Sequence, residues 1–160
     1  MRQPSPRFQK LQRWLPIALT VIIADRVAKL SAAHLTSPIA LIPGVIGLRY
    51  AENTGMAFSL FSGMPWLLGL LSLAIIVTGY LVLRQYRLGK LAMTAAMLML
   101  GGAVANMIDR FALGYVVDMI QFLFIDFPIF NVADSCLVVG ALLMAWSLLR
   151  RPEEWHANPA

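Results

Sequence analysis

The chain has few charged residues. Only 13% of its 160 residues are Asp, Glu, Lys or Arg, whereas 59% are hydrophobic, and soluble domains typically carry about 25% charged residues. It also has a single cysteine, Cys136, so an intrachain disulfide is excluded, and we expect this thiol to pack as a small apolar group. The low charge nearly excludes a water-soluble globule.

Four long hydrophobic windows account for this composition. They cover residues 14–33, 65–83, 91–108 and 129–149. At about 1.5 Å rise per residue, helices of this length match the ~30 Å hydrocarbon core of a bilayer. The sequence therefore predicts a mainly α protein with four transmembrane helices. It would form one integral membrane domain over residues 1–160, with outer loops at 34–64 and 109–128.

The basic residues predict the orientation. The net charge is +5, and nine of the 13 Lys and Arg residues lie before the first window, between the second and third, or after the fourth: Arg2, Arg7, Lys10, Arg13, Arg84, Arg87, Lys90, Arg150 and Arg151. The positive-inside rule places these segments, and both termini, in the cytoplasm. This distribution favours a membrane protein over a nucleic-acid partner.

A cleavable signal peptide is an alternative for the first window, because a basic start and Ser31-Ala32-Ala33 imitate a leader. Asp25, Arg26 and Lys29 interrupt that stretch, however. Without this span, the basic residues of the later connections would also no longer lie on one side of the membrane and the acidic ones on the other. We therefore expect the first window to remain in the protein.

The first outer loop has two β-prone segments, 45–50 and 56–61. They flank Ala51-Glu52-Asn53-Thr54-Gly55, where Asn and Gly supply turn chemistry. The pattern predicts a small extracytoplasmic sheet resting on the membrane surface. A short periplasmic helical segment is expected on the same side.

Several ionisable residues fall within or beside the windows, where each costs at least about 2.5–3.5 kcal/mol to insert. Asp25 and Lys29 are four residues apart and can pair on one helical face. They would hold the outer end of the first helix, with Arg26 reaching the lipid head groups.

The third window ends in a similar group. Gly102 permits close helix approach, and Asn106, Asp109 and Arg110 share one face. Two interpretations stay open: Asp109 and Arg110 mark the end of the span at the head groups, or the group forms part of a site. The Asn106 amide needs hydrogen-bond partners in either case.

Two carboxylates stand out further along the chain. Asn131 and Asp134 have the spacing of an N-cap and its N3 residue, so capping explains part of that pattern. Asp118, alone in an apolar run, has little structural reason to be there. Two carboxylates converging in a low dielectric share a proton and can activate water for attack on a carbonyl.

Other hydrolytic chemistries lack their residues. His34 and His156 lie in predicted opposite compartments, and the chain has no HExxH or CxxC pattern, so we expect no metal and no cofactor. No histidine is placed to serve as a base for Ser59 or Ser135. An aspartic hydrolase fits best.

The polar motifs, in order, resemble those of the bacterial prolipoprotein signal peptidases, or signal peptidase II. They are Asp25-x-x-x-Lys29, Asn53-x-Gly55-x-Ala57-Phe58, Gly102-x-x-x-Asn106-x-x-Asp109-Arg110, Val117-Asp118 and Phe130-Asn131-x-Ala133-Asp134. Each is short, but their order across four predicted spans is specific.

This resemblance implies a membrane aspartyl endopeptidase of the bacterial inner membrane. Such an enzyme cleaves diacylglyceryl-modified prolipoproteins immediately before the lipidated cysteine, with its active site on the periplasmic side. By motif, Asp118 and Asp134 are the catalytic dyad, and Asn53, Asn106, Arg110 and Asn131 bind or orient the substrate. Asp25, Lys29, Gly55, Gly102 and Asp109 are supporting. The resemblance further implies a monomer in contact with membrane lipids, inhibited by globomycin.

Three other functions fit the sequence less well. A small proton- or cation-coupled transporter subunit could use the same acids as an ion path, but these lie mostly at one face rather than at the bilayer midplane. Lipid head-group transfer would favour metal-binding acids on a cytoplasmic segment. An assembly factor would leave Asp118 unexplained.

Overall fold

The computed structural model describes residues 12–55 and 61–157. The bases Arg2, Arg7 and Lys10, most of the predicted 56–61 segment, and Ala57 and Phe58 of the second motif lie outside these residues. Arg13 and the remaining predicted site residues lie inside them.

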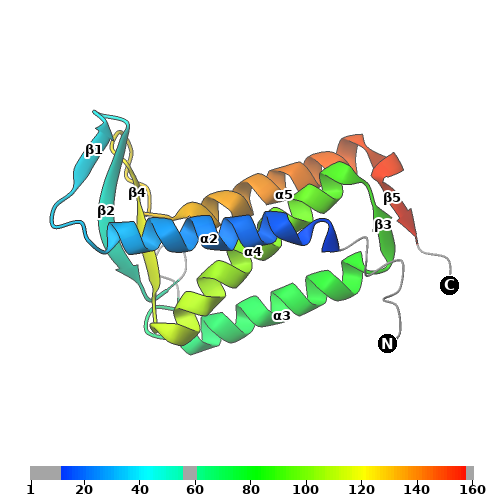
Figure 1. Cartoon of the computed structure of the whole chain (residues 1–160), viewed down its shortest axis with the longest axis horizontal. Helices are drawn as coiled ribbons and strands as arrows, with labels where there is room; N and C mark the ends of the chain where they lie inside the picture. Colours follow the sequence, from blue (N-terminus) through cyan, green and yellow to red (C-terminus); the bar gives the residue numbers. More distant parts are fainter. Residues whose placement is uncertain (1–11, 56–60, 158–160) are drawn as a thin grey trace.

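Four long helices make up most of the described chain: α2 (Leu15–Ala32), α3 (Pro65–Leu83), α4 (Lys90–Ala112) and α5 (Val132–Arg150) (Figure 1). Each corresponds to one hydrophobic window, and α3 matches its predicted bounds. Three of the helices in the described residues, α3, α4 and α5, have the length and apolar composition to cross a membrane. The shorter α2 carries three charged residues, Asp25, Arg26 and Lys29.

Helix α4 lies at the centre of the bundle and packs against α2, α3 and α5. Glycines allow this close approach. A Cβ at Gly101 would lie 2.8 Å from the Ala18 carbonyl oxygen of α2, and one at Gly102 would lie 2.5 Å from the Ala133 carbonyl oxygen of α5. The helices therefore meet backbone to backbone at the middle of α4.

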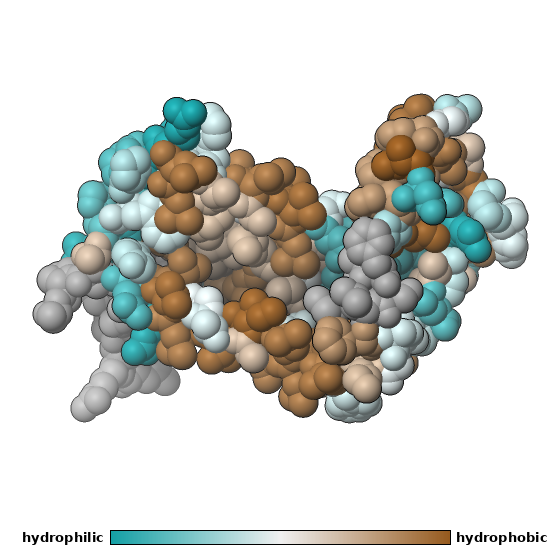
Figure 2. All heavy atoms as spheres, turned by 180° about the vertical axis from the view of Figure 1, so that it is seen from behind, coloured by the Kyte–Doolittle hydropathy of each residue, from teal (hydrophilic) through white to brown (hydrophobic). Residues whose placement is uncertain are grey.

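The surface of the helices is strongly apolar. In α3 only Leu68 and Gly69 are buried, and exposed apolar side chains also cover α2 and α5. Figure 2 shows apolar atoms over much of one side of the bundle. Such a surface suits lipid rather than water.

A three-stranded antiparallel sheet lies at one end of the bundle (Figure 1), with the order β1 (Ile39–Ile42), β2 (Ile46–Asn53) and β4 (Val116–Phe122). The predicted small sheet is confirmed, but the turn expected at 51–55 is partly wrong. Residues 51–53 belong to β2 because their backbone pairs with 116–118 of β4.

The ends of two helices differ from the prediction. Helix α4 continues to Ala112 instead of ending near 108, and α5 starts at Val132 instead of 129. The backbone of Phe130 pairs with that of Ile120, which keeps the residues before α5 extended. In the described part of the two outer connections, the only α-helical residues after 108 are the last turn of α4, so the separate short helix is not found there.

A second, two-stranded sheet lies at the opposite end of the bundle (Figure 1). Strand β3 (Tyr86–Leu88) pairs with β5 (Trp155–Ala157), which follows the short 3-10 helix η2 (Pro152–Glu154). The Glu154 carboxylate accepts a hydrogen bond from Ala92 N at 2.9 Å. It thereby satisfies an amide of the first turn of α4, whose N-cap, Gly89, offers no side chain.

Candidate active site

Polar side chains gather where the four-helix bundle meets the three-stranded sheet. Six of the predicted site residues are at most 5% exposed: Asp25, Lys29, Asn106, Asp109, Asp118 and Asn131. They come from α2, α4, β4 and the start of α5, so the cluster depends on the tertiary fold. Buried polar groups at this density require mutual hydrogen bonds and charge pairing.

Asp118 lies on β4 with both carboxylate oxygens occupied. Its Oδ2 accepts a hydrogen bond from Asn53 Nδ2 at 3.0 Å, and its Oδ1 accepts one from Asn131 Nδ2 at 2.7 Å. Asn53 reaches it because β2 pairs with β4 at this point. The predicted association of Asn53, Asp118 and Asn131 is thus present in the structure.

Asp134 is bound in a similar way from the first turn of α5. Its Oδ1 accepts a hydrogen bond from Asn106 Nδ2 at 2.7 Å, and its Oδ2 accepts one from the backbone nitrogen of Asn131 at 3.2 Å. All four oxygens of the two carboxylates therefore receive an N–H donor. Asp118 is buried, whereas Asp134 is partly exposed.

Asn131 connects the two carboxylates. Its Oδ1 accepts from Asp134 N at 2.8 Å, which completes a capping box at the start of α5. Its Nδ2 donates to Asp118 and also to Asn106 Oδ1 at 3.1 Å. The predicted N-cap is confirmed, and the same fully buried amide also orients Asp118.

Burial raises the pKa of Asp118 to about 6. The hydrogen bonds from Asn53 and Asn131 act in the opposite direction, and the charge of Asp134 adds to the increase. The two carboxyl groups are thus close enough to influence each other's ionisation. Asp118 titrates near neutral pH, as suits a group that gives and takes a proton.

A buried ion network supports this arrangement from α2. Lys29 Nζ lies 2.6 Å from Asp25 Oδ2 and 2.7 Å from Asp109 Oδ2, and it donates to Asn106 Oδ1 at 2.9 Å. The predicted Asp25–Lys29 pair is confirmed. Because Lys29 holds the oxygen of the Asn106 amide, the nitrogen of that amide points to Asp134.

Asp109, for which two interpretations were open, is fully buried within the polar cluster. Arg26, which was expected to reach the lipid head groups, instead donates through Nη2 to Asp109 Oδ1 at 2.7 Å. The reason is charge balance, since a buried carboxylate beside a single lysine shared with Asp25 needs a second cation.

The network also contains a contact that the sequence did not indicate. Asp25 Oδ1 accepts from the backbone nitrogen of Ala133 at 2.9 Å, so a side chain of α2 holds the first turn of α5. Ala133 is fully buried and its carbonyl faces Gly102. The spacing of the sequence held no signal for this contact, because a backbone nitrogen is the donor and the two residues are 108 positions apart.

Arg110 and the two predicted glycines complete the cluster. Arg110 donates through Nη2 to the Gly55 carbonyl at 3.3 Å, and its charge acts on both Asp134 and Asp118. The Gly55 amide donates to Asn53 Oδ1 at 3.0 Å, which fixes that side chain as a donor to Asp118. Gly102 lies in the α4–α5 contact, so its role is packing.

In the described part of the chain, no group of three or more His, Cys, Asp or Glu side chains is placed to hold a metal ion. What the cluster offers is a pair of carboxylates, their amide donors and a nearby guanidinium. Fold and site together define a helical membrane protein with a paired-carboxylate centre.

The chain belongs to the signal peptidase II family, whose model, described as "Signal peptidase (SPase) II", matches residues 17–150. It is 37% identical over 150 residues to a lipoprotein signal peptidase of Latilactobacillus sakei, covering 89% of this chain and 97% of that one. It is 36% identical over 158 residues to one from a Nostoc species, covering 96% and 99%.

A solved structure described as a bacterial membrane enzyme has the same fold. Its TM-score is 0.81 at 28% identity, with 93% of this chain and 94% of that chain covered. The resemblance seen in the motifs is therefore confirmed at the level of family and fold, and a protease is the class of enzyme to which this chain belongs.

Proposed function

We propose that this chain is an aspartic endopeptidase that removes signal peptides from diacylglyceryl-modified lipoprotein precursors, cutting immediately before the lipidated cysteine. The observation that carries the mechanism is the pair Asp118 and Asp134, whose four oxygens are all held by N–H donors and whose charges interact. Family membership supports the substrate.

Charge counting supports a dyad that shares one proton. Asp25 and Asp109 face Lys29 and Arg26, so two acids are balanced by two bases. Arg110 then remains to face Asp118 and Asp134. A pair carrying one proton has one negative charge, which Arg110 neutralises, whereas two ionised carboxylates would leave a buried excess.

The reaction then follows general acid–base catalysis. The ionised carboxylate takes a proton from water as the water oxygen attacks the scissile carbonyl carbon, while the protonated carboxyl donates a hydrogen bond to the carbonyl oxygen. The resulting tetrahedral species breaks its C–N bond. The nitrogen of the leaving amine receives a proton from the dyad, which returns to its singly protonated state.

Substrate binding requires donors and acceptors for an extended stretch of signal peptide, because unwinding a helix in lipid frees backbone groups that must be paired again. Asn53, Asn106 and Asn131 already donate to the dyad, so their first task is to orient it. Arg110 lies beside both carboxylates and is the strongest candidate to meet a substrate carbonyl.

We propose that all four helices cross the inner membrane. In α2 the charges at Asp25 and Lys29 are paired and buried, which removes the main cost of placing them at membrane depth. Arg84, Lys90 and Arg150 lie at the helix ends next to the β3–β5 sheet, and Arg87 lies in β3 itself. This sheet is at the end of the bundle away from the dyad (Figure 1). By the positive-inside rule, this distribution supports cytoplasmic termini and a site on the periplasmic side.

The direct test compares a diacylglyceryl-modified precursor with its unlipidated counterpart, each incubated with the purified protein in lipid vesicles. We expect only the lipidated precursor to be cut, with the new N-terminus at its modified cysteine. Equal cleavage of both would refute the lipid requirement, and cleavage of neither would refute the activity. Further arms with globomycin and a metal chelator should give inhibition with the first and none with the second.

A further inference from the structure

The free end of the three-stranded sheet carries an apolar surface that the proposed reaction does not use. We call it the apolar tip, and it comprises residues 39–46 and 122–130. Its two parts are joined by a hydrogen bond from Leu123 N to the Val45 carbonyl at 3.0 Å. The exposed apolar side chains are Ile39, Leu41, Ile42, Val45, Leu123, Phe124, Ile125 and Phe127.

Four phenylalanines organise this tip. The Phe122 ring lies 5.6 Å from Phe124, 5.6 Å from Phe127 and 5.2 Å from Phe130, measured between centroids. Phe124 is nevertheless 62% exposed and Phe127 is 45% exposed. The rings therefore pack against one another, while Phe124 and Phe127 remain exposed to the surroundings of the protein.

The chemistry of the surroundings can be inferred from the charges. Residues 35–48 contain no charged residue, and 119–130 contain only Asp126. A surface for a nucleic acid, an acidic peptide or anionic head groups would need basic residues, so this one suits acyl chains and the interfacial region of a bilayer. Aromatic side chains are enriched at that depth.

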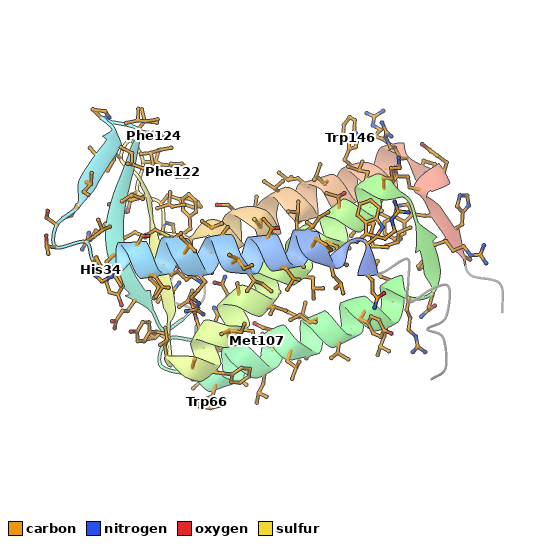
Figure 3. All side chains as sticks on the ribbon, viewed as in Figure 1. His34, Trp66, Met107, Phe122, Phe124 and Trp146 are labelled. Carbon is orange, nitrogen blue, oxygen red and sulfur yellow. The ribbon has the colours of Figure 1, made fainter. Side chains whose placement is uncertain are left out.

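The position of the tip supports the same partner. The sheet extends beyond the bundle to one side, roughly across the helix direction, and Phe122 and Phe124 lie near its free end (Figure 3). Seen from behind, this end projects as an arm whose upper part carries mainly apolar atoms, with a hollow between it and the helices (Figure 2). If the helices cross the membrane, the hollow lies in the outer leaflet.

We propose that the apolar tip inserts into the outer leaflet and anchors the sheet at a fixed depth. The anchor is connected to both halves of the dyad. Phe122 lies on the same strand as Asp118, four residues later, and Phe130 directly precedes Asn131. Lipid contact at the tip therefore sets the height of the paired carboxylates relative to a lipid-anchored scissile bond.

The insertion of the tip rests on the orientation given under the proposed function but not on proteolysis, so this part of the proposal can be tested without cleavage. A spin label is placed at position 124 in a Cys136→Ala background, in vesicles of neutral phospholipid without substrate. Labels at Ile75, an exposed residue within α3, and at His34, beyond the end of α2 (Figure 3), serve as membrane and water references.

We expect the label at position 124 to be accessible to oxygen and shielded from a water-soluble nickel chelate. Both accessibilities should be closer to those of the label at position 75 than to those of the label at position 34. Values equal to those at position 34 would refute insertion. Short distances between labels on two molecules at high dilution in lipid would show that a second copy covers the tip, and would also overturn the proposal.

A second arm separates anchoring from folding. The double variant Phe124→Ser, Ile125→Ser should lose cleavage several-fold in vesicles and retain the wild-type rate in detergent micelles, where depth is not imposed by a bilayer. Leu142→Ser, which changes an equally exposed residue of α5, should retain the wild-type rate in both. An equal loss of cleavage rate in vesicles and in micelles would contradict an anchoring role.

Discussion

Asn131 Nδ2 donates a 2.7 Å hydrogen bond to Asp118 Oδ1, while Oδ1 of the same amide caps α5 by accepting from Asp134 N at 2.8 Å. One buried side chain thus joins a strand that carries one carboxylate to a helix that carries the other. Asn131 therefore couples the geometry of the dyad to the start of α5.

This dual role of Asn131 can be separated by substitution. Asn131→Ser keeps an N-cap oxygen but removes the amide donor, whereas Asn131→Ala removes both. We expect the free energy of unfolding of Asn131→Ser to be about 0.5–2 kcal/mol higher than that of Asn131→Ala. Both variants should nevertheless be inactive in the cleavage assay. Denaturant unfolding and cleavage assays on both variants test this. Recovery of activity together with stability in Asn131→Ser would contradict the donor role.

Lys29 should be needed for both stability and activity. Lys29→Met leaves Asp25 and Asp109 without their shared cation in a buried setting, a loss that typically costs about 3–5 kcal/mol. It also frees the Asn106 amide to rotate away from Asp134. Arg26→Met is the comparison variant, because Arg26 is partly exposed and Asp109 keeps its contact with Lys29, so its loss of stability should be clearly smaller than that of Lys29→Met. Similar unfolding of the two variants would contradict this account.

The raised pKa of Asp118 makes stability depend on pH. An acid with a pKa of about 6 in the fold and about 3.9 in the unfolded chain binds more protons when folded. The free energy of unfolding therefore falls as pH rises from about 4 to 6, by at most about 3 kcal/mol. Asp118→Asn should remove this slope.

Thermal unfolding at pH 4.5 and 7.5 tests that slope. We expect Asp118→Asn to gain stability relative to the wild-type protein at pH 7.5 and to lose most of this gain at pH 4.5. Asp126→Asn, which changes an exposed acid, should follow the wild-type protein at both values. A constant difference between Asp118→Asn and the wild-type protein would show that burial does not raise this pKa.

Gly102 should tolerate no side chain. A Cβ there would lie 2.5 Å from the Ala133 carbonyl oxygen and 2.9 Å from Leu137 Cγ, so Gly102→Ala should destabilise by about 1–3 kcal/mol. Gly79→Ala is the control, since nothing lies within 4 Å of its Cβ position, and it should stabilise α3 by about 0.5–1 kcal/mol. Equal thermal shifts would show that the helices can move apart at little cost.

Hydrophobic length and helix pattern predicted the positions of the helices well, because lipid-facing α3 needs only an apolar run between Pro65 and Arg84. Helix ends were harder to predict. The spacing of Asp109 and Arg110 left open whether they end a span or join a site, and the structure pairs them with Arg26, Lys29 and Gly55 inside the fold. Such partners lie far away in the sequence, and spacing alone cannot find them.

Part of the candidate site could be predicted from residues that lack a local partner in the sequence. Asp118 stood out because an apolar run gave it no local partner, and the structure supplies one from β2 and another from the start of α5. The sequence could not predict which way the side-chain amides of the site point. The orientation of Asn106 depends on Lys29, and that of Asn53 on the Gly55 amide, so both follow from tertiary contacts.

The central claim is that Asp118 and Asp134 together cleave the lipidated precursor. The most direct measurement is the cleavage rate of purified Asp118→Asn, Asp134→Asn and Asp126→Asn on a diacylglyceryl-modified precursor, with helical content and thermal unfolding confirming that each is folded. We predict no detectable product from the first two and the wild-type rate from the third. Normal processing by a folded Asp118→Asn or Asp134→Asn protein would contradict the account.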